Sequence, residues 1–333
     1  MKRFEPVIVG FVCNECVYAA ADLAGTTRLS YPSNIRLIRV PCSGQVDMTH
    51  ILRAFENGAD GVFVGGCLKE QCHYVDGNVK AEKRIHFLRE TLKAMGIKEE
   101  RLGIHFMSAS MGREFANFAQ ELTSTIRKLG PSPLKGKTKT IHQNGKRAML
   151  RDMLLSMAKK ADVSKIDFSV VIEGFGETEI DKNKCIGCGA CDYVCKDGAM
   201  AVEVKKDGLL IKNTYWKCTA CRMCSDVCPK ECLEVKDVFD LSRFLGGKEE
   251  IKTEVGMTQC ENCGKSFLPL MLAQDIERFL STKDRTGEFL DHCPKCRKLD
   301  QADRIRRTQG LAGKPMRVKS QKSSKRLTTK WVK

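Results

Sequence analysis

Over residues 7–129 the hydrophobic positions follow two alternating patterns. Short runs rich in branched apolar residues, typical of buried strands, lie at residues 7–12, 35–40, 61–66 and 102–107. Elsewhere apolar residues recur every three or four positions and mark helix faces: Met48, Ile51, Leu52 and Phe55; Ile85, Leu88, Leu92 and Met95; Phe115, Phe118, Leu122, Ile126 and Leu129. Alternating strands and helices predict an α/β domain on a parallel sheet that is covered on both sides.

The second half of the chain has shorter elements. A helix is expected at roughly 148–161, and strands at 168–173, 200–204 and 209–213. The changes in pattern predict five parts: an α/β domain (1–130), a Pro-, Gly- and Lys-containing linker (131–147), an α+β domain with a lead-in helix and strand (148–240), a small module (241–303) and a basic tail (304–333).

One cysteine spacing occurs twice in the predicted α+β domain, as CIGCGACDYVC and CTACRMCSDVCP. Two residues between the first three thiols and three before the fourth is the spacing of bacterial-type ferredoxins, in which the fourth cysteine of each run ligates the other cluster. We therefore predict a two-[4Fe–4S] ferredoxin-like domain. The first centre is assigned to Cys185, Cys188, Cys191 and Cys228, and the second to Cys218, Cys221, Cys224 and Cys195. Cys232 is left over and is expected to be a packing residue.

The overall composition is consistent with metal binding. The chain has 333 residues and 18 cysteines, and the cysteines are clumped, with none between His73 and Lys184. Clumped thiols in a chain whose start lacks the features of a secretory leader indicate metal ligands rather than disulfides. No apolar run approaches the roughly 18 residues that span a bilayer. We expect a protein of the reducing cytoplasm.

Five further cysteines accompany the predicted parallel strands. Cys13, Cys42 and Cys67 each follow a strand, and Cys16 and Cys72 lie near the starts of the next helices. The carboxyl ends of parallel strands meet at one sheet edge, so these thiols are expected to converge there. The residues alone allow two interpretations: a cluster held by four of the five, or a dithiol redox site at Cys13 and Cys16 of a thiol–disulfide oxidoreductase.

Residues 5–130 contain the segments VGFVCNECVYAAADLAG, RVPCSGQVD, GGCLKEQCHY and SMGREF. With these segments the region resembles the delta subunit of methyl-viologen-reducing hydrogenase. It implies a [2Fe–2S] cluster on four of the five N-terminal cysteines, and electron transfer to the A-type subunit of heterodisulfide reductase, a flavoprotein that bifurcates electron pairs. The family pattern ends near residue 130, so this chain departs from it by carrying further modules.

The last cysteines form two pairs. Cys260 and Cys263, then Cys293 and Cys296, are Cys-x-x-Cys knuckles of the kind that hold zinc in a four-thiolate ribbon; iron with the same ligands is the other possibility. The tail that follows is strongly basic. Of the formal charge of +16, residues 304–333 contribute eleven Lys or Arg and no acidic residue. Such a segment can bind an acidic partner protein, anionic lipid or nucleic acid, or simply aid solubility.

Together these features predict an electron-transfer subunit without a substrate site of its own. We expect it to relay electrons between a hydrogenase, formate dehydrogenase or ferredoxin and the flavoprotein, in anaerobic energy metabolism such as methanogenesis. The alternative is a redox-sensing protein that binds nucleic acid through the zinc ribbon and basic tail. Salt-dependent retention on nucleic acid distinguishes the two, because phosphate contacts weaken steeply with salt.

Overall fold

The computed structural model describes residues 4–134, 145–160, 167–281 and 290–310. The chain divides into two compact units. The first contains the chain up to Val170 together with Asp240–Gly246, and the second contains Val171–Phe239 and the described residues from Gly247 onward. Within the described ranges, no helix is both long enough and apolar enough to cross a membrane.

The first unit is built on a parallel sheet, as predicted. Strands β1 (Ile8–Cys13), β2 (Ile35–Val40), β3 (Gly61–Gly66) and β4 (Leu102–Phe106) lie in the order β2-β1-β3-β4. All neighbouring strands run parallel. The inner strand β3 is buried along its whole length, because helices cover both faces of the sheet.

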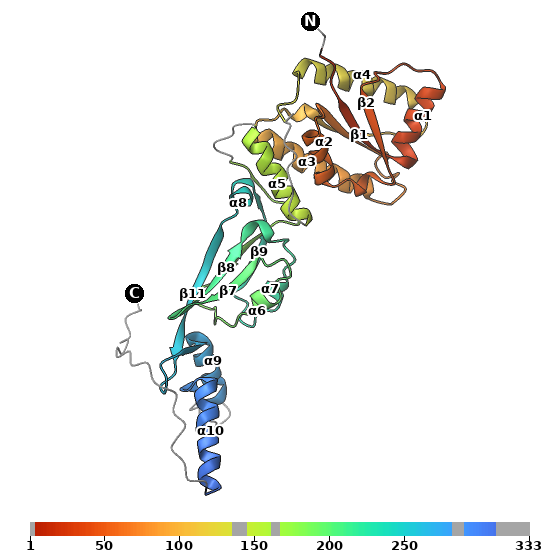
Figure 1. The fold of residues 1–333 in the computed structure, drawn as a ribbon. Helices are drawn as coiled ribbons and strands as arrows, with labels where there is room; N and C mark the ends of the chain where they lie inside the picture. Colours follow the sequence, from red (N-terminus) through yellow and green to blue (C-terminus); the bar gives the residue numbers. More distant parts are fainter. Residues whose placement is uncertain (1–3, 135–144, 161–166, 282–289, 311–333) are drawn as a thin grey trace. The chain divides into compact units, whose positions relative to one another are not determined.

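Helices α1 (Ala19–Thr26) and α4 (Gly112–Leu129) cover one face of this sheet, and α2 (Met48–Glu56) and α3 (Gly77–Ala94) cover the other (Figure 1). Three of these helices, α2, α3 and α4, match the predicted apolar faces, and α1 is an additional helix for which no face was predicted. Short helical turns lie at Asn14–Tyr18, Ser43–Gln45 and Glu99–Arg101. The first directly follows β1 and the second follows β2, so both lie at the sheet edge to which the cysteines were assigned.

A buried polar cluster ties the start of the α/β domain to its end. Arg101 is 3 % exposed and donates hydrogen bonds to the carbonyl oxygens of Asp60 and of three residues at and just after the end of α4. The carboxylate of Asp60 accepts the backbone N–H groups of Val7 and Ser132. Residues 131–134 therefore pack on the first unit, although the sequence predicted them to begin a linker. The remainder of that predicted linker, up to residue 144, lies outside the described residues.

Helix α5 (Lys146–Lys160) also belongs to the first unit. It packs against α2 and against α8 (Leu241–Gly246), and Arg151 donates to the carbonyl oxygens of Phe244 and Leu245 at 3.0 and 2.8 Å. The predicted lead-in helix of the ferredoxin-like domain thus lies with the α/β domain. The predicted strand at 168–173 is reduced to β5 (Ser169–Val170).

The second unit contains an antiparallel sheet in the order β12-β11-β8-β7. Its strands are β7 (Met200–Val204), β8 (Gly208–Thr214), β11 (Glu249–Gln259) and β12 (Ser266–Pro269). A separate pair joins β6 (Gly176–Ile180) to β9 (Leu233–Asp237). The other elements are α6 (Ala190–Tyr193), a helical turn (Tyr215–Lys217), α7 (Met223–Asp226), α9 (Leu270–Ser281) and α10 (Pro294–Thr308). Strand β10 (Phe239–Asp240) lies where the chain passes from the second unit into the Asp240–Gly246 segment of the first.

Strand β11 connects the two cysteine-bearing parts of the second unit. It pairs with β8 over most of its length and with β12 at its end. The sequence predicted a boundary at residues 240–241, but β11 joins the sheet that precedes this boundary. The first C-terminal pair, Cys260 and Cys263, consequently follows directly from a strand of the ferredoxin-like sheet.

Candidate metal centres

The first cavity of the second unit gathers thiols from both cysteine runs. Its lining includes Cys185, Cys188 and Cys191 of the first run and Cys228 of the second, and its empty volume is about 360 Å³. These are the four cysteines assigned from spacing to the first [4Fe–4S] centre. The lining also includes Cys232, which the cysteine spacing leaves outside both ligand sets.

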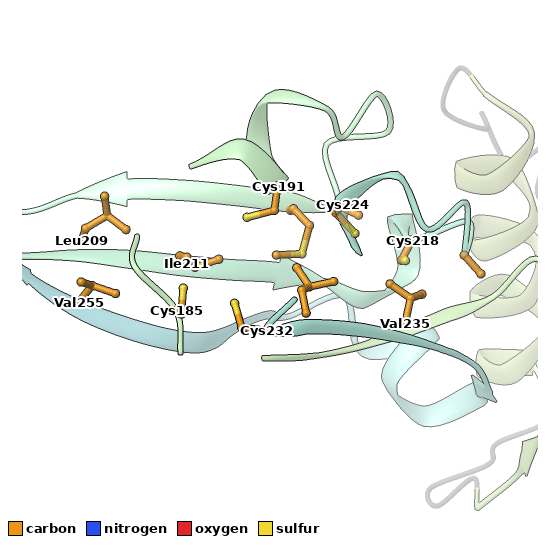
Figure 2. Packing of buried hydrophobic residues seen from close by; sticks show 13 residues of the cluster. Cys185, Cys191, Leu209, Ile211, Cys218, Cys224, Cys232, Val235 and Val255 are labelled. Atoms are coloured by element: carbon orange, nitrogen blue, oxygen red, sulfur yellow. The ribbon is translucent and has the colours of Figure 1, made fainter. Parts of the chain in front are cut away.

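The second cavity is of nearly the same size, with an empty volume of about 340 Å³. It is lined by Cys218, Cys221 and Cys224 of the second run and by Cys195 of the first. The fold therefore exchanges the fourth cysteine of each run between the two cavities, the arrangement that the repeated spacing predicts. The buried thiols lie in one apolar cluster with residues such as Leu209, Ile211 and Val255 (Figure 2).

Backbone N–H groups point at the fourth cysteine of each run, Cys195 and Cys228, and suit thiolates that bind a metal. The Sγ of Cys195 accepts the N–H groups of Ala199 and Met200 at 3.2 and 3.3 Å. For Cys228, burial raises the pKa, but hydrogen bonds from the N–H groups of Cys232 and Lys230 outweigh it and leave the pKa lowered. Such donors stabilise negative charge on sulfur and fit a cluster ligand.

The innermost thiols need a metal to lose their protons. Burial, reinforced by the neighbouring cysteines, raises the pKa of Cys191 to about 12 and that of Cys224 to about 11. Without a cation these groups are neutral at physiological pH. Because metal ligands must be deprotonated, loading either cavity releases protons and binds the surrounding chain segments together.

Each run wraps its cavity with two left-handed backbone positions. In the first run these are Gly187 (φ 70°) and Gly189 (φ 78°), whereas the second run places Ala220 (φ 54°) and Arg222 (φ 61°) there. Glycine adopts this conformation without steric cost, but alanine and arginine do not. Arg222 is also held by an ion pair with Asp237 and a hydrogen bond to the carbonyl oxygen of Ala220.

The N-terminal cysteines converge at one edge of the parallel sheet. The Sγ atoms of Cys13, Cys16 and Cys67 all lie within 4.8 Å of one another. Cys42 and Cys72 hydrogen bond to each other through their side chains, and the charge of Cys13 also acts on Cys42. The fold thus joins all five predicted thiols, as a group of three beside a group of two.

Helix α3 contributes positive potential to this group. Burial raises the pKa of Cys72, but the N–H groups of Asn78, Tyr74 and Gly77 prevail and lower it. By contrast, burial raises the pKa of Cys67 to about 11. A helix start favours a thiolate through its unpaired N–H groups and its dipole. Cys72 is therefore the thiol of this group that is prepared for negative charge before a metal binds.

Three residues that the sequence analysis did not identify position these thiols. Gly77 allows close approach, because a Cβ there would stand well under 3.0 Å from the Sγ of Cys42. The buried side chain of Asn78 donates to the carbonyl oxygens of Cys67 and Leu68, and Arg84 donates to those of Gly44 and Val46. In the second cavity Gly176 has the same role, since a Cβ there would meet the Sγ of Cys218 at 2.5 Å. Nothing in the local pattern separates these residues from ordinary loop glycines and polar helix residues.

The C-terminal cysteines form a third group. The Sγ atoms of Cys260, Cys263, Cys293 and Cys296 all lie within 4.8 Å of one another, packed against Phe267. The first pair forms the expected knuckle, in which the N–H of Gly264 donates to the carbonyl oxygen of Cys260. The second pair was also expected in a knuckle, but Cys293 instead occupies the N-cap position of helix α10 and Cys296 lies in its first turn. This helix start replaces the second turn of a ribbon.

The donor set of this third group suits a thiophilic metal ion. Burial raises the pKa of Cys260, yet the N–H groups of Cys293, Cys263 and Asn262 outweigh it and lower the pKa to about 6. Four thiolates at these mutual distances provide the tetrahedral sulfur coordination that zinc and mononuclear iron share.

An iron–sulfur protein is the class that this fold and these thiol groups define, and comparison with known proteins agrees. Residues 8–130 match the family described as methyl-viologen-reducing hydrogenase, delta subunit, and residues 178–235 match a 4Fe–4S dicluster domain. The chain belongs to the delta subunit family of methyl-viologen-reducing hydrogenase, and carries the dicluster domain in addition.

Relatives with the same N-terminal domain have two kinds of architecture. The D-type iron–sulfur subunit of the F420-non-reducing vhu hydrogenase of Methanococcus maripaludis is 49 % identical over 131 residues, which are 39 % of this chain and 98 % of that protein. The corresponding hydrogenase subunit of Archaeoglobus profundus is 48 % identical over 130 residues, 39 % of this chain and 95 % of that protein. The A-type subunit of the ferredoxin/F420H2-dependent CoB–CoM heterodisulfide reductase of Methanosarcina acetivorans is 44 % identical over 126 residues, 38 % of this chain but 16 % of that longer protein.

Proposed function

We propose that this protein is an electron-transfer subunit that relays electrons between a hydrogenase, formate dehydrogenase or ferredoxin and a heterodisulfide reductase A-type flavoprotein. The observation that carries the proposal is the pair of matched cavities, each lined by three thiols of one cysteine run and the fourth of the other. When bound, the clusters supply one-electron redox chemistry. The chain supplies the thiolates, the N–H donors and a largely apolar surrounding that tune it.

The ligand sets follow the thiol groups. Cys185, Cys188, Cys191 and Cys228 hold one [4Fe–4S] centre, and Cys195, Cys218, Cys221 and Cys224 hold the other. Four of the five N-terminal cysteines hold a [2Fe–2S] centre, and the C-terminal group holds zinc. Every proposed cluster ligand is a thiolate, which together with cluster charge favours low reduction potentials.

The partners are proposed from the two architectures of the relatives. In the proteins named as iron–sulfur subunits of a hydrogenase, the N-terminal domain is a separate chain. In the A-type heterodisulfide reductase subunits of two Methanosarcina species, a similar domain is part of the larger polypeptide. A domain that is covalently joined to a flavoprotein in one lineage is expected to dock with such a protein where the two are separate.

The test starts from protein purified without oxygen. We expect about ten iron atoms per chain, eight in the two [4Fe–4S] centres and two in the [2Fe–2S] centre, with matching acid-labile sulfide and one zinc. The reduced protein should then reduce the flavin of the A-type flavoprotein, followed by absorbance. A Cys224→Ser variant, which alters one proposed ligand of the second centre, should slow this reaction severely.

Two results would contradict the proposal. One is zinc without acid-labile sulfide in protein whose metal content has been preserved. The other is a fully loaded protein that exchanges electrons with ferredoxin but never with the A-type flavoprotein. The protein would then relay electrons to a different acceptor.

The alternative, a redox-sensing nucleic-acid-binding protein, stays a prediction. The basic tail beyond Gly310 lies outside the described residues. Deletion of residues 304–333 should abolish salt-dependent retention on nucleic acid and leave flavin reduction unchanged if both activities exist.

A further inference from the structure

The first cavity contains a fifth thiol that the proposed ligand set does not use. Cys232 is 8 % exposed, and its Sγ lies 3.4 Å from that of Cys228. Its side chain also hydrogen bonds with that of Cys185. In Figure 2 the thiols of Cys185 and Cys232 lie side by side and point toward strand β8. A residue expected to be simple packing therefore contacts two proposed cluster ligands.

The second cavity shows what the same position looks like without this thiol. Cys232 follows Cys228 by four residues, and Ala199 follows Cys195 by four residues. The N–H of Ala199 donates to the Sγ of Cys195, and the N–H of Cys232 donates to the Sγ of Cys228. Ala199 is 2 % exposed, so both positions are buried. The backbone around the exchanged ligand is thus alike in both halves, and the added thiol is a difference of side chain.

The direction of the hydrogen bond follows from the chemistry of a cluster ligand. A metal-bound thiolate carries no proton, so Cys228 can only accept, and Cys232 must donate. Free cysteine is a weak donor, but a buried partner with negative charge strengthens the bond.

We propose that Cys232 is a positioning residue whose S–H donates to the ligand sulfur of Cys228 and raises the reduction potential of the first [4Fe–4S] centre. The inference rests on the proposed function. Reduction adds negative charge to the cluster and its sulfurs, so a donor to a ligand sulfur stabilises the reduced state more than the oxidised one. The second centre has Ala199 at this place and lacks this contribution.

Three substitutions in the full chain test the role of the thiol. Cys232→Ala reproduces the side chain of the second cavity, Cys232→Ser restores a smaller donor, and Ala199→Ser introduces a donor at the second centre. Iron, acid-labile sulfide and both midpoint potentials are measured in anaerobic protein by redox titration monitored by electron paramagnetic resonance. The expected result is unchanged iron and sulfide in every variant, with changes confined to the potentials.

The pattern of shifts distinguishes a donor from a packing residue. Cys232→Ala should lower one midpoint potential and leave the other in place, and Cys232→Ser should return it toward the wild-type value. Ala199→Ser should raise the other potential. A packing role predicts no recovery with serine, because a hydroxyl fills less volume than a thiol, and this result would overturn the inference.

Three further results would also overturn it. If Cys232→Ala loses the iron of one [4Fe–4S] centre, Cys232 is itself a cluster ligand and not a hydrogen-bond donor to the ligand Cys228. If all potentials stay in place in variants with full iron and sulfide, the thiol does not act on the cluster, while the proposed function is untouched. Wild-type protein without cluster iron and sulfide would overturn both this inference and the proposed function.

Discussion

Replacing Gly77 by alanine tests how tightly the N-terminal thiols are packed. Gly77 is the first residue of α3, and a Cβ there would stand under 3.0 Å from the Sγ of Cys42 and 3.4 Å from that of Cys72. Cys42 has little room to move, since it is 5 % exposed and its Sγ accepts the N–H of Gly44 at 3.3 Å. The added methyl group must therefore displace either a proposed ligand or the start of the helix.

The size of the effect follows from two opposing contributions. Alanine is favoured over glycine in a helix by about 1 kcal/mol. Forcing a methyl group into a packed site costs about 1–3 kcal/mol, and the short distance to Cys42 places this site at the upper end. The net loss of about 2 kcal/mol corresponds to a roughly 30-fold weaker hold on the metal. It is small against a domain stability of about 5–15 kcal/mol, so the α/β domain should still fold.

Gly25→Ala is the matched control. Gly25 lies in α1 of the same unit, and a Cβ there would have no atom within 4 Å. After dialysis of both variants against a chelator without oxygen, Gly77→Ala should lose about two irons, the content of a [2Fe–2S] centre, and keep its far-ultraviolet circular dichroism. The control should retain them. Equal iron in both variants would refute the packing argument, and loss from the control would show that any substitution here disturbs the site.

Three other predictions concern stability. Ala220→Gly should stabilise the loaded protein against urea by about 0.5–1 kcal/mol, because it removes a left-handed alanine, and an unchanged or lower midpoint would contradict this. Arg101→Ala removes the cation beside the buried carboxylate of Asp60 and should destabilise the first unit by about 3–5 kcal/mol, seen as faster hydrogen exchange in β4; protection equal to wild type would be the contrary result. Burial lowers the pKa of His105 below its usual 6.5. The imidazole ring of His105 stacks on the ring of Phe118, with the two ring centroids 4.4 Å apart. His105 thus binds a proton more readily in the unfolded chain than in the folded one. The protection of β4 against hydrogen exchange should therefore fall as pH drops below about 6.5, and His105→Gln should flatten this dependence.

Most of the local structure could be predicted from the order of residues. The four parallel strands and three of their covering helices lie at nearly the predicted positions. A strand that is buried on both faces is a continuous apolar run, and a helix that is buried on one face has apolar residues every three or four positions. The repeated cysteine spacing likewise predicted a dicluster domain, which comparison confirms over residues 178–235. Which N-terminal thiols hold a cluster, and which metal the C-terminal group takes, stay predictions.

The remaining features depend on contacts between residues far apart in the chain. Helix α5 joined the first unit because it packs against α2 of the α/β domain, about 96 residues earlier in the chain, and no local pattern records such a partner. Cys232 lies against Cys185, and Gly77 against Cys42, only once the chain has folded. The residue order thus determined which segments become strands, helices and thiol-rich turns, since short-range periodicity and spacing decide these. Only the tertiary structure decided which glycine must stay small and which spare thiol meets a ligand, since these depend on distances across the fold.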